Sequence, residues 1–196
     1  MVKAMYNLWT KEKKNILFFS FELSRELLKR RIDSITAGAP YTKFRRGLVT
    51  LPERRRFTLN VSRQNKLGNW WEIITNENTD PSAAGGPNRL EYVYSKIMQL
   101  KPDIVAVDGF YLMKGSGDAD WERMASLTRG FHQVMQSTGV CGWATTQLKK
   151  TSDEKNPKLK DLSYSWTFAQ DADVVFLLSR DQEMTLNHEA ALTYLI

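Results

Sequence analysis

The sequence predicts an α/β protein with a mainly parallel, twisted sheet flanked by helices. Short apolar segments of strand length alternate along the chain with longer amphipathic segments of helix length, and this order is typical of parallel sheets. Three of the apolar segments end in a carboxylate or an amide, at Glu22, Asp108 and Gln147. Because the carboxyl ends of parallel strands lie along one edge of a sheet, we expect these three side chains within reach of a common ligand.

The composition indicates one globular domain. The 196 residues are 42% hydrophobic, which suffices for a sizeable core. No apolar run approaches the roughly 18 residues of a membrane span, and the start lacks the pattern of a signal peptide. The single cysteine, Cys141, excludes an internal disulfide and suits a reducing compartment.

The charge is unevenly distributed along the chain. Residues 1–66 hold 16 Lys and Arg against 5 Asp and Glu, whereas residues 67–196 hold 12 against 17. A basic amino-terminal third favours an anionic partner, nucleic acid first, and it equally fits a solvated helix surface. Charge alone leaves both interpretations open.

The chain opens inside a predicted helix. Met1, Met5 and Leu8 fall on one apolar stripe, and no capping residue precedes them. The last residues, "AALTYLI", are apolar, and no turn signal follows them. Both ends therefore look cut, and we expect residues 1–196 to form a single domain that is truncated at both ends.

Helix and strand signals then follow in alternation. After a strand at 16–21, a helix is expected from the N-cap Ser24 to the stop signal Gly38. A second helix should begin near Pro52, since proline suits the first turn. The remaining elements are expected as strands at 70–75, 103–108, 140–147 and 173–179, as helices over 88–100 and about 120–138, and as a short helix before the last strand.

The three polar strand ends suit three tasks of a phosphoryl-transfer site. Asp108 offers a hard oxygen to a nucleotide-bound Mg²⁺, through a water on the metal. Glu22 can orient and deprotonate an attacking water. Gln147 can donate to a γ-phosphate and accept from that water. Taken singly, each residue fits an ordinary exposed strand end better than a catalytic role.

One part of such a site is missing from the sequence. The phosphate-binding pattern G-x-x-x-x-G-K-[ST] has no match. The nearest approach is "GFYLMKGS", from Gly109 to Ser116, in which Lys and Gly come in the wrong order. If residues 1–10 are the helix that follows a phosphate loop, that loop lies just upstream of Met1.

Four segments, in order, carry a resemblance to a known family. "LFFSFELS" resembles the motif F-S-x-E-M-S, and "IVAVDGFYLM" resembles V-D-Y-L-Q-L-M. "ATTQLKK" resembles A-L-S-Q-L-N-R, and "DLSYSWTFAQDADVVFLLSRD" resembles D-L-R-x-S-G-x-I-E-Q-D-A-D followed by a strand and R-D. "QDADVV" is the most specific string, because composition gives no reason for it. The family is that of the DnaB-like replicative DNA helicases, in their C-terminal, RecA-like motor domain.

The resemblance implies a RecA-like P-loop NTPase fold and a hexameric motor that uses ATP and Mg²⁺ to translocate on single-stranded DNA. It implies Glu22 as the catalytic base, Asp108 as the acid that binds the Mg²⁺-nucleotide cofactor, and Gln147 as the coupling glutamine. The family's arginine finger would lie beyond "AALTYLI". The implied partners are further copies of the chain in a homo-hexamer, a primase and a helicase loader, with no membrane. The implied location is the cytoplasm of a bacterium, or of the bacterial host if the source is a phage.

One segment departs from the family in its DNA-facing loop. Ser163 and Trp166 stand where the motif has Arg and Gly after "DL". We expect Tyr164 and Trp166 to stack on bases of the single strand. The alternatives are that Trp166 packs into its own core and that the nearby lysines only solvate a loop. The lysines expected to attract the DNA are Lys149, Lys150 and Lys158.

Two other function classes fit parts of the sequence. One is a RecA/RadA-type recombination or repair ATPase, and the other is a non-catalytic, truncated paralogue that docks on a helicase ring. The order of "DLxxS" and "QDADVV" favours the helicase over the recombinase. Duplex unwinding against strand exchange would separate these two ATPases.

Overall fold

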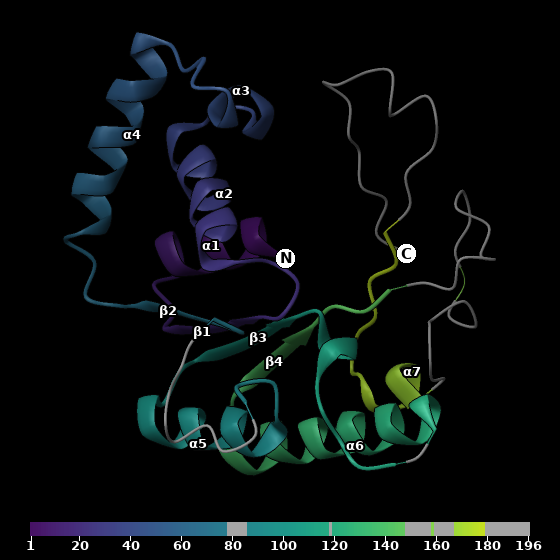
Figure 1. The fold of residues 1–196 in the computed structure, drawn as a ribbon. Coiled ribbons are helices and arrows are strands. Elements are labelled where there is room, and N and C mark those ends of the chain that lie inside the picture. Colours follow the sequence, from purple (N-terminus) through teal and green to yellow (C-terminus); the bar gives the residue numbers. More distant parts are fainter. Residues whose placement is uncertain (78–85, 118, 148–157, 159–166, 179–196) are drawn as a thin grey trace. The chain divides into compact units, whose positions relative to one another are not determined.

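The computed structural model describes residues 1–77, 86–117, 119–147, 158 and 167–178. It divides into two compact units, which are Met1–Met113 with Met135–Thr145 and Lys114–Val134 with Thr146–Ile196. The first unit contains a four-stranded sheet (Figure 1).

All four strands of this sheet run parallel, in the order β2-β1-β3-β4, which confirms the predicted α/β class. β1 and β3 lie in the centre, and apart from Asp108 their residues are buried. Central parallel strands are covered on both faces, so their sequences are almost continuously apolar. The bounds of the strands are Ile16–Ser20 for β1, Trp71–Thr75 for β2, Ile104–Asp108 for β3 and Cys141–Ala144 for β4.

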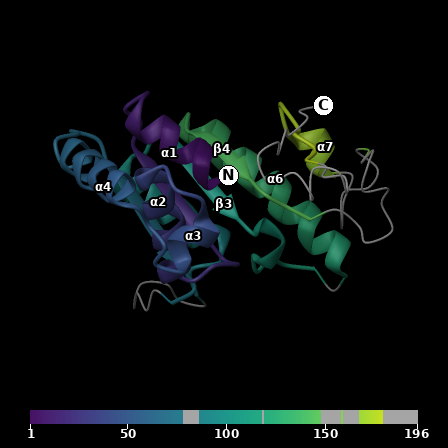
Figure 2. The ribbon, with the colours of Figure 1, turned by 90° about the horizontal axis from the view of Figure 1, so that it is seen from above.

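Helices of the first unit cover both faces of the sheet. In Figure 1, α1 to α4 lie on one side and α5 lies on the other. α2 contacts α1, α3 and α4, which gather around it in Figure 2. The bounds are Val2–Thr10 for α1, Arg25–Ala37 for α2, Tyr41–Arg45 for α3, Leu51–Gln64 for α4 and Leu90–Leu100 for α5.

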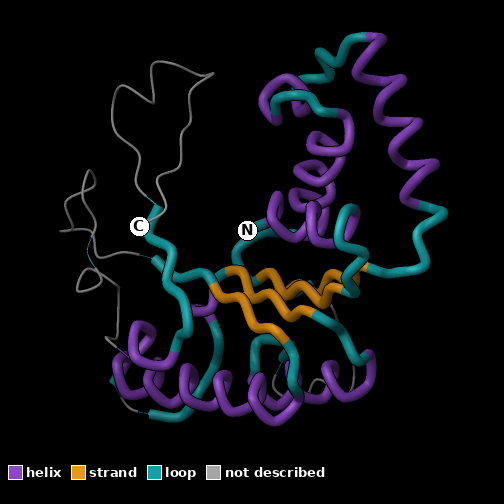
Figure 3. The backbone as a smooth tube through the Cα atoms, turned by 180° about the vertical axis from the view of Figure 1, so that it is seen from behind, coloured by secondary structure: helices purple, strands orange, loops and turns teal. Residues whose placement is uncertain are grey.

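Each face of the sheet carries its own apolar core, with the strands drawn in orange between the helices in Figure 3. On the α2 side, Leu28 packs with Phe18, whose ring centroid lies 5.9 Å from that of Trp71. On the α5 side, the rings of Phe19 and Tyr92 meet edge-on at 6.5 Å. Because successive residues of a strand point to opposite faces, Phe18 and Phe19 anchor β1 in both cores.

The predicted signals for α2 and α4 are confirmed. The Ser24 Oγ accepts a hydrogen bond from Leu27 N at 3.3 Å, and Gly38 ends α2 with a φ of +63°. α4 follows the N-cap Thr50 and has Pro52 in its first turn. The short helix α3 was not predicted, because its five residues after Pro40 are too few to show an apolar period.

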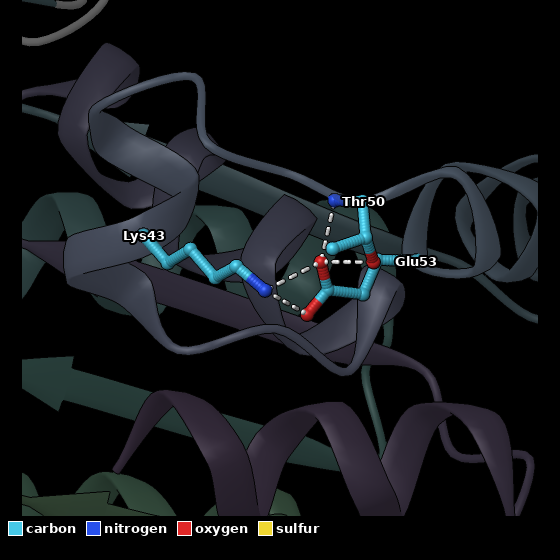
Figure 4. Close-up of polar contacts among 3 residues, drawn as sticks. All are labelled: Lys43, Thr50 and Glu53. Carbon is cyan, nitrogen blue, oxygen red and sulfur yellow. Dashed lines mark hydrogen bonds and ion pairs between the residues drawn. The ribbon is translucent and has the colours of Figure 1, made fainter.

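A capping box reinforces the start of α4 (Figure 4). The Glu53 carboxylate accepts hydrogen bonds from Thr50 N and Thr50 Oγ1, both at 2.7 Å. The Lys43 ammonium lies 3.1 Å from each of the two oxygens of this carboxylate. The bonds from the Thr50 hydroxyl and backbone, and then the one from Lys43, lower the pKa of Glu53 to about 2.

The second unit contains α7 (Thr167–Asp171) and most of α6 (Asp120–Thr138). The strand expected at 173–179 is wrong for the described residues 173–178, which form no strand. Leu177 is buried, whereas Val174 and Phe176 are 65% and 50% exposed. Burial therefore alternates along this segment as it would in a strand, but a strand also needs a hydrogen-bonded neighbour, which local sequence does not supply.

None of the helices in the described part of the chain combines the length and the apolar character that crossing a membrane requires.

Candidate active site

Glu22 and Asp108 lie at the same edge of the sheet. In the parallel register of β1 and β3, Ser20 pairs with Asp108. The next residue, Phe21, donates its backbone N–H to the Asp108 carbonyl at 2.9 Å. Glu22 follows directly, so the structure brings these two predicted carboxylates together at the carboxyl ends of the central strands, where ligands of open α/β sheets bind.

The turn after β1 is held from two sides. The Leu23 N–H donates to Ser20 Oγ at 3.3 Å, which closes the turn around Glu22. From the end of β2, the Asn76 side-chain amide donates to the Phe21 carbonyl at 3.1 Å. The backbone that carries Glu22 is therefore fixed by the sheet, although the side chain of Glu22 is exposed.

The Asp108 carboxylate is held by Thr145, the residue after β4. Thr145 Oγ1 donates to Asp108 Oδ1 at 2.9 Å and accepts from the Gly109 N–H at 3.0 Å. The backbone of Thr145 is itself fixed, because its N–H donates to the Val107 carbonyl at 3.0 Å. Asp108 is half-buried, and Thr145 orients one of its two carboxylate oxygens.

Tyr111 contacts the other carboxylate. Its hydroxyl donates to Glu22 Oε1 at 2.5 Å. Sequence reasoning missed both Tyr111 and Thr145. A hydroxyl residue directly after a strand of the sheet was a signal for Thr145, whereas the approach of Tyr111 depends on the path of the loop after β3.

An open pocket of about 320 Å³ includes Asp108 in its wall. Lys3 from α1 and Arg31 and Tyr41 from the α2–α3 region also line it. The Arg31 guanidinium lies 5.7 Å from the centroid of the Tyr41 ring, which stacks the two side chains. Lys3 and Arg31 line the same pocket as the Asp108 carboxylate. Such a set of charges suits an anionic ligand that carries a divalent cation.

The donor set at this edge fits Mg²⁺ held with a nucleotide. Mg²⁺ keeps several waters and takes one or two carboxylates together with substrate phosphates, and Asp108 supplies one such carboxylate. No cluster of three or more His, Cys, Asp or Glu side chains occurs among the described residues, so an all-protein metal cage does not form in that part of the chain. The backbone cradle for the phosphates has no counterpart in the sequence of the 196 residues.

The remaining predicted site residues fall in the sequence range of the second unit. Gln147 is exposed, lies three residues beyond the end of β4 and belongs to the second unit. Lys158 is also exposed. The other residues predicted to bind DNA lie outside the described part of the chain: Lys149, Lys150, Ser163, Tyr164 and Trp166.

Residues 1–194 match the protein family described as DnaB-like helicase C terminal domain. The chain belongs to this family. Three curated relatives are similar to this chain over part of their length. The probable replicative DNA helicase of Trieres chinensis is 30% identical over 196 residues, which cover 93% of this chain and 40% of that protein.

The replicative DNA helicases DnaB of Treponema pallidum and Geobacillus stearothermophilus are 26% and 25% identical to this chain. The alignments cover 86% and 89% of this chain, but 37% and 38% of the two relatives. The chain of this DnaB-like family member thus spans about two fifths of the length of its curated relatives.

Solved structures show the same fold. The structure described as the ATPase domain of G40P superimposes with a TM-score of 0.74 and 18% sequence identity, over 97% of this chain and 66% of that one. A DnaB-like replicative helicase, described with its interactions with primase, gives a TM-score of 0.72 and 18% identity over 93% of this chain and 44% of that one. These likenesses confirm the RecA-like fold that the sequence motifs predicted.

Proposed function

We propose that the chain is part of the motor domain of a replicative DNA helicase, which couples ATP hydrolysis to translocation on single-stranded DNA and to duplex unwinding. The observation that carries the proposal is the family match over residues 1–194. The shared sheet edge of Glu22 and Asp108 supports it, because phosphoryl transfer needs a metal-linked acid near a group that orients water.

In the proposed reaction, Glu22 acts as general base. It accepts one proton of a water whose oxygen bonds to the γ-phosphorus, while the bond from that phosphorus to the ADP oxygen breaks. Mg²⁺, when bound, neutralises charge on the phosphates. Asp108, oriented by Thr145, would bind a water of that metal, and Gln147 would contact the γ-phosphate and the attacking water.

Two parts of the proposed site come from outside these 196 residues. The phosphate-binding pattern is absent from the sequence, and in this proposal a segment outside these residues would supply the loop that cradles ATP. The arginine finger would come from a neighbouring copy in a homo-hexamer. We further propose a primase and a helicase loader as partners, and the cytoplasm of a bacterium or of a phage host as the location.

The proposed DNA contacts divide into stacking and electrostatic groups. Base stacking on an aromatic side chain is worth about 1–3 kcal/mol per base by alanine substitution, and each phosphate contact adds to the salt dependence of binding. We assign stacking to Tyr164 and Trp166, a backbone contact to Ser163, and the electrostatic part to Lys149, Lys150 and Lys158.

The decisive experiment replaces Glu22 with Gln in the complete helicase. Glu22→Gln removes the base but keeps the shape of the side chain, so DNA-stimulated ATP hydrolysis should be lost while nucleotide binding is retained. Hydrolysis is followed by phosphate release, and binding by titration with a fluorescent nucleotide. General acid–base groups typically contribute about 10²–10⁴-fold in rate, and the loss should fall in that range.

Glu26→Gln provides the matched control. Glu26 is an exposed carboxylate on α2 that pairs with Arg30, so its replacement changes the net charge equally and should leave hydrolysis unchanged. If the Glu22→Gln variant hydrolyses ATP at the normal rate, Glu22 is not the general base and is only an exposed residue at the end of a strand.

The missing phosphate loop favours one second candidate, a non-catalytic paralogue that docks on a helicase ring. The two functions differ in a simple observation. The paralogue would lack the phosphate-binding pattern in the complete protein too. It would bind the ring of an active helicase without hydrolysing ATP itself.

A further inference from the structure

Three consecutive residues after Asp108 depart from the family motif V-D-Y-L-Q-L-M, and Gly109 and Tyr111 are the two of them that contact Glu22. This chain reads "VDGFYLM", so Gly109 stands at the position of the motif's Tyr, and Tyr111 stands at that of its Gln. Both of these residues contact the same side chain in the structure, that of Glu22. These two departures therefore concern one carboxylate.

Gly109 makes room for Glu22. It has a φ of +81°, and a Cβ added to it would lie 2.7 Å from Glu22 Cγ, which is closer than real Cβ atoms approach a neighbour. The methylene chain of Glu22 thus lies where any other residue at position 109 would place its side chain. A tyrosine at this position is incompatible with the observed placement of Glu22.

Tyr111 then holds the end of the same side chain. Its hydroxyl donates to Glu22 Oε1 at 2.5 Å, a short bond of the charge-assisted kind. Tyr111 itself belongs to the short helix η1 (Phe110–Leu112), whose Phe110 is buried at 1% exposure and donates its N–H to the Thr145 carbonyl at 3.0 Å. The donor is thereby tied to the residue that orients Asp108.

We propose that Tyr111 is a positioning residue for Glu22. Its hydroxyl occupies Oε1, so that Oε2 is the oxygen presented to the attacking water. Glu22 is exposed, and an exposed glutamate with no such partner would populate several rotamers. This inference rests on the proposed role of Glu22 as general base.

Tyr111→Phe in the complete helicase tests the inference, because it removes one hydroxyl and keeps the ring. The rate of hydrolysis at saturating ATP should fall by roughly 10- to 100-fold, since misplacing a reacting group by about 1 Å can cost about 10²-fold. The dissociation constant of the nucleotide and the midpoint of thermal unfolding should stay at their original values. Tyr94→Phe, at an exposed tyrosine of α5, is the matched control and should change none of the three.

A double variant links the effect to Glu22. In single-turnover hydrolysis, the residual rate of Glu22→Gln should be the same with Tyr or Phe at position 111, since Tyr111 acts only through the carboxylate. A further loss in the double variant would overturn the inference. So would an unchanged rate in Tyr111→Phe, or a fall in rate matched by weaker nucleotide binding and lower thermal stability.

The result for Glu22→Gln separates this inference from the proposed function. If Glu22→Gln abolishes hydrolysis while Tyr111→Phe leaves it intact, the role of Glu22 stands and only the positioning role of Tyr111 is refuted. If Glu22→Gln hydrolyses ATP normally, both are refuted.

Discussion

Gly109 and Gly47 share a backbone conformation but differ in their surroundings. Both have a left-handed φ, +81° and +72°, yet a Cβ at Gly47 would meet no atom within 4 Å. For a residue with a Cβ, this conformation costs roughly 1–2 kcal/mol. The comparison of the two glycines therefore separates the cost of the backbone conformation from the cost of crowding Glu22.

We expect Gly109→Ala and Gly47→Ala to lower the free energy of unfolding by similar amounts, roughly 1–2 kcal/mol. The extra clash at Gly109 involves Glu22 Cγ, and the exposed Glu22 side chain can move away from it. Only Gly109→Ala should therefore reduce ATP hydrolysis in the complete helicase. Urea unfolding of the chain gives the first comparison and phosphate release the second; equal activity in both variants would contradict this account of Gly109.

At the scale of elements, α4 differs from α2 and α5, which both have buried residues. No residue of α4 is buried, and polar side chains join it to its neighbours. Asn60 Nδ2 donates to the Thr36 carbonyl at 2.9 Å, and Gln64 Nε2 donates to Tyr6 Oη at 2.8 Å. With little apolar area to stabilise it, α4 depends on the capping box at Glu53.

The stability of α4 should depend on pH through Glu53. The pKa of Glu53 in the folded chain is lowered from 4.5 to about 2, so the contribution of this carboxylate is complete above about pH 4.5 and is lost as the pH falls toward 2. Helical circular dichroism in a titration from pH 6 to 2 should therefore fall less steeply for Glu53→Gln than for the original chain.

The control for this titration is Glu26→Gln. Glu26 is an exposed residue in the first turn of α2, with an i,i+4 ion pair to Arg30, and such surface pairs contribute little. Its replacement should leave the titration curve unchanged. A Glu53→Gln curve that coincides with the original would show that the charge of Glu53 does not stabilise α4.

Elements whose ends are marked by characteristic start or stop residues could be predicted from the sequence, and the others could not. Ser24, Gly38 and Pro52 mark where helices start or stop by their own chemistry, so the bounds of α2 and the start of α4 followed from them. The segment 173–179 contains a continuous apolar run of strand length, but pairing is decided by a partner elsewhere in the chain.

For the whole molecule, the absence of the phosphate-binding pattern has a direct consequence. In the proposed mechanism, the purified 196-residue chain should hydrolyse ATP at a negligible rate. Its sequence lacks the phosphate-binding pattern, and the proposed arginine finger of a neighbour would be worth roughly 10³–10⁵-fold in rate. Phosphate release by the chain, compared with that of the complete helicase, measures this. Robust turnover by the isolated chain would show that its phosphate site is built differently.

The candidate site was predictable to the extent that it follows from sheet topology. Glu22 and Asp108 end neighbouring parallel strands, so their meeting at one edge follows from the α/β pattern alone. Tyr111 reaches Glu22 through the path of the loop after β3, whereas Thr145 follows β4 directly and meets Asp108 across the pair of strands. The spacing of apolar residues along the chain does not predict the path of such a loop.

β4 is an edge strand only four residues long. Among the described residues it pairs with β3 alone, and Cys141, Gly142 and Ala144 along it are exposed. The outer edge of a terminal strand can template the addition of a strand from another molecule. If the isolated chain associates through β4, the exposed thiol of Cys141 would lie at the contact, and oxidation would then give dimers that a reducing agent separates.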